Sequence, residues 1–228
     1  MLLGPALVAT GGWWIGAILV VFFLTAALLP EHGDGAPSRT WRQVLANGGP
    51  ALIFAAGYQL TGHDALLTGA AATIAATTAD TWATEVGRAI GGEPWSVRTR
   101  QRVPSGTSGA VSGAGTLATV AGAILIAIVA FLLRSISPAG DHPGVGAVIA
   151  IGLAGALGSL IDSVLGATLQ ARFICVTCGH HSESPSPHLP GHRMYPASGI
   201  PWLTNSAVNL SSALAAGVVA SLLASIVQ

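Results

Sequence analysis

Three carboxylate residues stand in or beside strongly apolar segments of this chain. Asp80 and Glu85 follow the apolar run of residues 65–76, and Asp162 lies far downstream in another apolar segment. Ionisable side chains in membrane segments are costly to desolvate and usually face the interior of a helical bundle or a wet cavity. We therefore predict that the two segments meet and build one polar site inside a membrane protein. An alternative stays open, in which Asp80 and Glu85 only cap a helix or snorkel at the membrane interface.

The three carboxylates are hard oxygen ligands. Magnesium is typically held by one or two carboxylates together with substrate phosphates and waters. Asp80 and Glu85 are five positions apart and do not share one face of an ideal helix, so either the helix unwinds near Thr81 or the two do different jobs. We expect Asp80 and Asp162 to hold Mg²⁺ or phosphate, with Glu85 as a second ligand, a base or an arginine partner.

A loop rich in glycine and hydroxyl residues could bind phosphate. It covers residues 103–109, just before an apolar segment, and contains Ser105, Gly106, Thr107, Ser108 and Gly109. Glycines permit unusual backbone angles, and N–H groups and hydroxyls at a helix N-terminus suit phosphate oxygens. The loop is not a Walker A motif, because it lacks Gly-Lys-Ser/Thr and the chain has no Lys. The alternative is a plain connector.

Three arginines precede this loop: Arg98, Arg100 and Arg102. They could neutralise the charge that develops on a transferred phosphoryl group, with Arg102 as the catalytic candidate and the other two as binding candidates. The alternative is a solvated, positively charged loop on the cytoplasmic side of the membrane.

Four amide side chains are candidates to line the same site: Asn47, Gln170, Asn205 and Asn209. Asn47 precedes a Gly-Gly-Pro break, and its alternative is an ordinary helix start. Asn205 and Asn209 open the last apolar segment on one helical face. Gln170 ends a stripe that recurs every four residues and includes Gly158, Asp162 and Gly166.

The only two cysteines form a C-x-x-C spacing at Cys175 and Cys178. This spacing suits a metal or redox site better than a disulfide framework. Four histidines follow: His180, His181, His188 and His192. The set loosely resembles Cys2His2 zinc ligation, and we take Cys175, Cys178, His188 and His192 as the candidate zinc ligands. A metal-free loop with two free thiols and a catalytic thiol are the alternatives.

The composition indicates an integral membrane protein. Of 228 residues, 51% are hydrophobic and 8% are charged, whereas soluble domains carry about 25% charged residues. The apolar runs predict an all-α polytopic bundle of about six transmembrane helices. We expect one integral membrane domain over residues 1–228, with a long loop at 171–204. The expected helices cover about 11–29, 43–60, 65–90, 110–133, 144–170 and 205–226.

The arginines predict an orientation. Eight of the nine lie in the first, third and fifth interhelical loops or at their edges, and only Arg134 lies on the opposite side. An excess of positive charge marks the cytoplasmic side, so the polar motifs should face the cytoplasm and both termini should face outward. Residues 1–12 lack a basic region, so we expect no cleaved signal peptide. We expect a bacterial cytoplasmic membrane, lipid contact and, since the formal net charge is zero, no nucleic-acid partner.

Five blocks of the chain, in order, resemble those of one membrane family. They are residues 42–48, 79–85, 104–112, 161–170 and 205–209. The family is the ninety-second domain-of-unknown-function family, which includes vertebrate transmembrane protein nineteen and the plant phytyl-phosphate kinase of vitamin E synthesis. The resemblance covers about residues 13–209. Relatives often have more helix before residue 13 and tend to carry a His-x-Cys-Gly element where this chain has His188-Leu189-Pro190-Gly191, so a metal site here would need His192 or another histidine.

The resemblance implies an isoprenyl-phosphate kinase. Such an enzyme transfers a phosphoryl group from a nucleoside triphosphate, CTP or ATP, to an isoprenyl monophosphate lipid to give the diphosphate. Magnesium would be required, and zinc would be structural. A second hypothesis is an ion-coupled transporter, in which Asp80, Glu85 and Asp162 bind the coupling ion. A non-catalytic membrane scaffold is a third.

Overall fold

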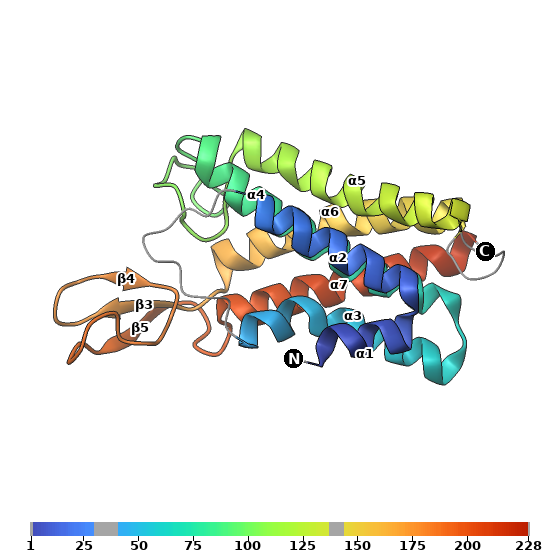
Figure 1. The fold of residues 1–228 in the computed structure, drawn as a ribbon. Helices are drawn as coiled ribbons and strands as arrows, with labels where there is room; N and C mark the ends of the chain where they lie inside the picture. The colour runs from blue at the N-terminus through green and yellow to red at the C-terminus, as the bar shows by residue number, and fades with distance from the viewer. Residues whose placement is uncertain (1, 30–40, 137–143, 228) are drawn as a thin grey trace.

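A computed structural model describes residues 2–29, 41–136 and 144–227. These residues form an elongated helical bundle with a small sheet at one end (Figure 1). The helices are α1 (Leu3–Gly11), α2 (Trp13–Leu28), α3 (Trp41–Thr61), α4 (Asp64–Ile90), α5 (Gly113–Ile136), α6 (Val145–Thr168) and α7 (Asn205–Val227). The predicted all-α membrane class is therefore confirmed, and the last four predicted helices differ from the observed ones by only a few residues.

Helix α4 is the centre of the bundle. It contacts α2, α3, α5, α6 and α7, and each of residues 67–79 is buried. The helix can be enclosed because small residues allow close approach of its neighbours. A Cβ at Gly155 or Gly158 of α6 would come within 2.6 Å of the Ala75 or Ala76 methyl carbon, and one at Gly122 of α5 would come within 3.1 Å of Ala79 Cα.

The first predicted helix, about 11–29, corresponds to α2, whose bounds differ from it by one or two residues. The separate helix α1 before it was not predicted. The two helices meet at Gly12, whose φ of +81° ends α1 and starts α2 in a new direction. A left-handed glycine interrupts the helix without interrupting the apolar composition, so hydropathy alone does not reveal the break.

Within the described part of the chain, three helices are long and apolar enough to cross a membrane: Gly113–Leu133, Val145–Thr168 and Asn205–Ile226. Helix α2 is apolar but has only 16 residues, and α3 and α4 are long but less apolar. An enclosed helix such as α4 contacts protein rather than lipid and so tolerates polar residues. The count of six spans stays a prediction.

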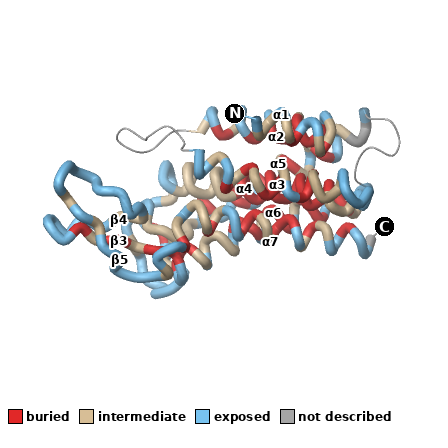
Figure 2. The backbone as a smooth tube through the Cα atoms, turned by 90° about the horizontal axis from the view of Figure 1, so that it is seen from below, coloured by how far each residue is buried: buried red, intermediate tan, exposed pale blue. Residues whose placement is uncertain are grey.

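The chain also contains short strands that the sequence did not indicate. Strands β1 (Trp95–Ser96) and β2 (Ala110–Val111) pair antiparallel between α4 and α5. The predicted loop at 171–204 instead contains an antiparallel sheet in the order β4-β3-β5, built from β3 (Arg172–Cys175), β4 (His181–Ser182) and β5 (Met194–Ser198). The sheet is mostly exposed, whereas burial concentrates in the middle of the bundle (Figure 2).

Both strand groups lie at the same end of the bundle, which we call the loop end. Helices α3, α5 and α7 begin there, and α4 and α6 end there (Figure 1). Residues 30–40, with Arg39, and residues 137–143 lie outside the described part of the chain. The predicted alternation of helix directions therefore holds for α3 to α7.

Candidate functional site

Four helices bring polar side chains to one small cavity. Asn47 of α3, Thr77 and Asp80 of α4, Asp162 of α6, and Asn209 and Ser212 of α7 line it, together with Ala76 and Ala213. The space inside it that a water-sized group can occupy is about 10 Å³, roughly what one water molecule needs. Ligand pockets for small organic molecules usually measure about 300–1,000 Å³. The cavity therefore has room for about one ion or one water molecule, and not for a nucleotide.

Hydrogen bonds join the residues that line the cavity across the four helices. Ser212 donates through its hydroxyl to Asp162 Oδ2 at 2.9 Å. The side-chain amide of Asn209 lies 3.2 Å from that of Asn47. When the side-chain nitrogen of Asn209 points toward α6, it donates to Asp162 Oδ2 at 3.2 Å and to the Asn205 carbonyl at 2.9 Å. Thr77 Oγ1 lies 3.2 Å from the Asn47 carbonyl. The carboxylate of Asp162 is thus positioned by α7, and Asn47 is positioned by both α4 and α7.

Asn47 does not stand beside a helix break. Helix α3 continues through Pro50, which is buried inside it. Pro50 has no N–H group to donate to the carbonyl one turn earlier, but its ring is accommodated within the bundle. The expected Gly-Gly-Pro break is therefore wrong, although Asn47 does reach the polar cavity.

Glu85 takes a different place from Asp80. Helix α4 is continuous through Thr81, so Asp80 and Glu85 point about 140° apart around its axis. Glu85 does not line the cavity. Its Oε2 atom is enclosed, as is Trp82 Nε1, and neither has a hydrogen-bond partner among the described residues. The helix therefore does not unwind near Thr81, and the five-residue spacing places the two carboxylates in different surroundings.

The glycine-rich loop before α5 docks on the end of α6. Gly109 has a φ of +66° and leaves no space for a Cβ against the backbone of Ser163 and Ala167. A Cβ at Gly166 would lie 3.0 Å from Ser108 Oγ. Ser108 donates to Gln170 Oε1 at 3.0 Å. The loop therefore lies about one helical turn, roughly 6 Å along α6, from Asp162.

The exposed part of the loop offers donors for an anion. Thr107 is engaged locally, because its N–H and hydroxyl both donate to the Pro104 carbonyl. Ser105 and Gly106 are exposed, and no hydrogen bond joins their backbone N–H groups to another described residue. A Cβ at Gly106 would lie 3.8 Å from Arg88 Nε. Arg88, in the last turn of α4, is therefore the cation that flanks this loop.

The predicted arginines lie in a hairpin instead. Arg98, Arg100 and Arg102 are exposed, and Arg100 occupies the turn with a φ of +54°. Arg102 Nη1 donates to the Glu93 carbonyl at 3.1 Å, and its guanidinium lies 5.4 Å from the Trp95 ring centroid. None of the three lines the acidic cavity.

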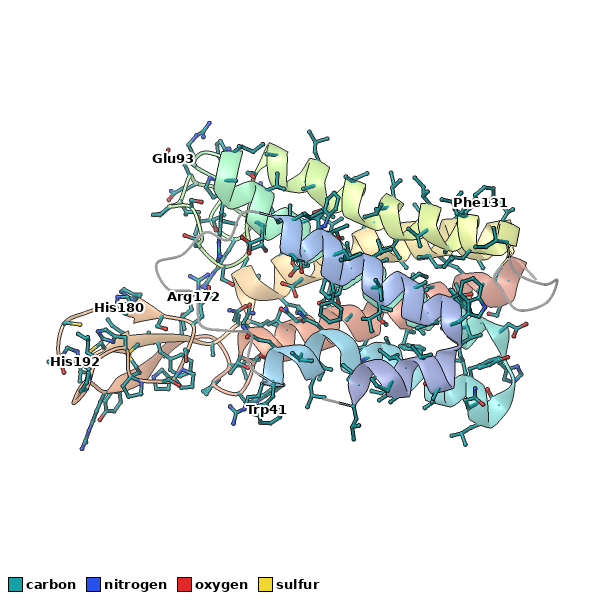
Figure 3. All side chains as sticks on the ribbon, viewed as in Figure 1. Trp41, Glu93, Phe131, Arg172, His180 and His192 are labelled. Carbon is teal, nitrogen blue, oxygen red and sulfur yellow. The ribbon has the colours of Figure 1, made fainter. Side chains whose placement is uncertain are left out.

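The two cysteines and two of the histidines converge in the sheet. Cys175 Sγ lies 3.3 Å from His192 Nδ1, and Cys178 Sγ lies 3.3 Å from His188 Nε2. Figure 3 shows His180 and His192 at the tip of the sheet, far from the bundle, and Arg172 at the junction. Burial acts to raise the pKa of the Cys175 thiol, but hydrogen bonds from Cys178, Thr177 and His192 lower it to about 6.

The sequence analysis did not single out several residues of these sites. Ser212 stands seven positions after Asn205 and three after Asn209, so the helical repeat could have found it. Thr77 stands three positions before Asp80 by the same repeat. Glu183 accepts a hydrogen bond from Gln170 Nε2 at 2.9 Å, and no local pattern signals this contact. No sequence pattern indicates Arg88 either, because its position beside Gly106 depends on how the loop folds back onto α4.

Gln170 connects the sheet to the glycine-rich loop at the loop end. Gln170 is 3% exposed and bridges Ser108 on one side to Glu183 on the other. Asn205, which opens α7, offers its carbonyl to Asn209. Of the four predicted amides, Asn47 and Asn209 line the acidic cavity, while Gln170 joins the glycine-rich loop to the sheet.

Comparison with known proteins identifies the family. The model of integral membrane protein DUF92 matches residues 1–217. The chain is 32% identical to Protein PGR of Arabidopsis thaliana over 90% of this chain and 80% of that protein. It is also similar to two uncharacterized membrane proteins. The protein from Synechocystis is 32% identical over 84% of this chain and 62% of that relative. The protein from Methanocaldococcus jannaschii is 36% identical over 69% of this chain and 66% of that relative. No solved structure matches significantly. The chain belongs to the DUF92 family of integral membrane proteins.

Proposed function

We propose that this membrane protein is an isoprenyl-phosphate kinase. It transfers the terminal phosphoryl group of a nucleoside triphosphate, CTP or ATP, to a prenyl monophosphate. The bond between that phosphorus and the bridging oxygen of the nucleotide breaks, and a bond to an acceptor phosphate oxygen forms. A prenyl diphosphate and a nucleoside diphosphate result. The acceptor oxygen is already anionic at neutral pH, so the reaction needs positioning and charge neutralisation rather than a strong base.

The observation that carries the proposal is the pair of carboxylates, Asp80 and Asp162, in one ion-sized cavity. The polar side chains that line this cavity are carboxylates, amides and hydroxyls, whose oxygens are the hard donors that Mg²⁺ prefers. The donor set therefore fits magnesium, with Asp80 and Asp162 as its carboxylate ligands. When bound, magnesium would neutralise negative charge on the phosphate oxygens. Glu85, enclosed and without a partner among the described residues, is a further candidate for a cation or an arginine.

The neighbouring loop would bind phosphates. Ser105 and Gly106 offer exposed N–H groups beside Arg88, and Arg98, Arg100 and Arg102 add positive charge to the same end of the bundle. Backbone N–H groups before a helix suit phosphate oxygens. Because the cavity is too small for a nucleotide, the nucleotide would lie at the loop end, with its terminal phosphate toward Asp162.

The prenyl chain would lie in the lipid along the bundle. Large apolar side chains on the outer faces of α5 and α6 are exposed, including Leu117, Ile124, Leu153, Leu157 and Leu160. A lipid tail can contact such faces while its phosphate reaches the loop end. We further propose that this end faces the cytoplasm of a bacterial cell, where nucleotides and Mg²⁺ are available.

The test is phosphoryl transfer by the purified protein. Mg²⁺, CTP or ATP, and phytyl, geranylgeranyl or farnesyl monophosphate are supplied, and the prenyl diphosphate is measured by mass spectrometry. We expect Asp80→Asn and Asp162→Asn each to reduce the rate at least about 100-fold, because transition-state charge is left uncompensated. Asp64→Asn is the matched control, since Asp64 is exposed at the opposite end of α4. Folded wild-type protein that makes no diphosphate from any pair would overturn the proposal for these substrates.

The second candidate is an ion-coupled transporter, and the size of the cavity favours it. A site that holds an ion and not a nucleotide is also what a coupling-ion site requires. The two functions are separated by measuring substrate flux into sealed vesicles without a nucleoside triphosphate. Flux that depends on Asp80 and Asp162, with no diphosphate formed, would establish transport.

A further inference from the structure

We propose that Cys175, Cys178, His188 and His192 form a structural zinc site that holds the β3–β5 sheet and, through it, the glycine-rich loop before α5. The four donor atoms, two sulfurs and two ring nitrogens, all lie within 4.8 Å of one another. They come from a segment that the acidic cavity and the proposed kinase chemistry do not use. The inference is therefore independent of the proposed function, and its tests measure metal content and local order rather than activity.

Two of the donor separations are close to those of a loaded tetrahedral site. Zinc–sulfur bonds of about 2.3 Å and zinc–nitrogen bonds of about 2.0–2.1 Å place neighbouring donors roughly 3.3–3.8 Å apart. The Cys175–His192 and Cys178–His188 sulfur–nitrogen separations are both 3.3 Å. Two thiolates and two imidazoles in a tetrahedral arrangement select Zn²⁺ over Mg²⁺, Ca²⁺ and Mn²⁺, which prefer oxygen ligands.

The backbone around the cysteines is shaped for a thiolate ligand. The N–H groups of Thr177 and Cys178 donate to the sulfur of Cys175. The turn is closed by the Gly179 N–H, which donates to the Cys175 carbonyl at 2.8 Å. Gly179 has a φ of +73°, as this tight turn requires. Such N–H groups stabilise negative charge on sulfur, and the thiolate is the form that binds metal.

The four ligands join the two connections of the sheet. Cys175 ends β3 and Cys178 lies in the turn to β4, while His188 and His192 lie in the irregular segment between β4 and β5. The side chains buried in this region are few: Ala171, Phe173, Cys175 and Leu203. Units of fewer than about 40 residues rarely hold together by apolar burial alone. A metal ion that closes both connections would supply the missing stability.

The sheet is connected to the bundle at Gln170. Glu183, just after β4, accepts from Gln170 Nε2 at 2.9 Å, and Gln170 Oε1 accepts from Ser108 at 3.0 Å. The Ile200 N–H donates to the Leu169 carbonyl, and the Ala171 N–H donates to the Leu203 carbonyl, both at 2.9 Å. A folded sheet therefore fixes Glu183, which orients Gln170 against the loop that contains Ser108. Loss of zinc should loosen both regions.

The first test is metal content. The full chain is purified in mild detergent from cells supplied with zinc, and metals are measured by inductively coupled plasma mass spectrometry. We expect one zinc ion per chain in the wild type, and loss of that zinc in Cys178→Ser and His188→Ala. His181→Ala is the matched control, because His181 is an exposed histidine of the same sheet that lies outside the four-ligand cluster. Wild-type protein without zinc, or with a different metal, would overturn the site.

A second measurement covers the case in which a ligand variant fails to fold. Wild-type protein is stripped with a chelator and titrated with Co²⁺, which in a two-thiolate tetrahedral site gives sulfur-to-cobalt charge-transfer absorption. If a thiol reagent shows that both cysteines are free and the absorption is still absent, the 3.3 Å contacts are hydrogen bonds only and the zinc site is overturned. A disulfide between Cys175 and Cys178 in cells would also overturn the proposal.

The coupling to the loop is tested by hydrogen exchange. We expect chelation to speed exchange in residues 171–204 and in residues 104–109, while residues 118–130 of α5 stay protected. Gln170→Ala should speed exchange in residues 104–109 without releasing zinc. If zinc is bound but its removal leaves residues 104–109 unchanged, the link to the loop is overturned and the zinc site stands.

Discussion

At the scale of residues, the acidic cavity depends on side chains that position the carboxylates. Ser212 is 5% exposed and lies 2.9 Å from Asp162 Oδ2 and 3.1 Å from the Asn209 carbonyl. A hydroxyl has one hydrogen, and a carboxylate is the stronger acceptor, so the bond to Asp162 should dominate. Ser212 would then act through Asp162 rather than by touching a substrate.

Ser212→Ala should weaken the proposed magnesium binding without abolishing the fold. Loss of a residue that orients a metal-binding carboxylate typically lowers metal affinity or activity about 10- to 100-fold. The measurement is the Mg²⁺ concentration that half-stabilises the protein in a thermal unfolding series, which needs no substrate. Ser211→Ala is the control, because the neighbouring Ser211 is exposed and bonds only to its own helix, at the Ala207 carbonyl. An equal effect of both variants would contradict the assigned role.

The sequence predicted the members of the cavity better than their arrangement. Asp80, Asp162, Asn47 and Asn209 stood out because polar residues in apolar segments are conspicuous, and they do line one cavity. Ser212 and Thr77 were overlooked, since serine and threonine are common in such helices. The contact of Arg88 with the glycine-rich loop could not be predicted, because it joins residues that meet only after the chain turns back.

At the scale of elements, small residues decide how closely the helices pack around α4. Gly158 of α6 faces α4 and α7, and a Cβ there would lie 2.6 Å from Ala76 Cβ and 2.9 Å from Ala216 Cβ. Gly113, the first residue of α5, by contrast, has nothing within 4 Å of its Cβ position. The two helical glycines therefore have opposite surroundings.

Replacement of each glycine by alanine should change stability in opposite directions. Gly158→Ala forces α6 away from its neighbours, and overpacking of this kind costs about 1–3 kcal/mol. Gly113→Ala adds helix propensity in open space and should stabilise by up to about 1 kcal/mol. Thermal unfolding of both variants in the same detergent measures the difference. A fall in midpoint for Gly113→Ala, or none for Gly158→Ala, would show that the helices pack differently.

The elements themselves were predictable where one physical cause dominates. The last four helices follow from long, mainly apolar segments bounded by polar loops, and their bounds are nearly those expected. The break at Gly12 depends on one backbone angle. The sheet in residues 171–204 pairs positions as distant as Arg172 and Ser198 through strands of two to five residues. Strands that short carry too little alternation to be recognised from sequence.

At the scale of the whole molecule, the bundle is polar at one end and apolar around its middle. The loop end carries the β1–β2 hairpin, the β3–β5 sheet and the glycine-rich loop (Figure 1). The turn between α3 and α4, with Gly62 at a φ of +70°, lies at the other end. Asp162 lies six residues before the end of α6, about 9 Å by helical rise, so the cavity lies in the half of the bundle nearer the loop end.

This polarity predicts a single orientation in the membrane. Arg88, Arg98, Arg100, Arg102, Arg172 and Arg193 all belong to the loop end, and positive charge is retained on the cytoplasmic side. A protease site inserted after Arg100, in an exposed turn, should be cut only in inside-out vesicles. The same site inserted after Gly62, also exposed, should be cut only in right-side-out vesicles. Cleavage at Arg100 from outside would place the acidic cavity away from cytoplasmic nucleotides, and the kinase proposal would then lack its co-substrate.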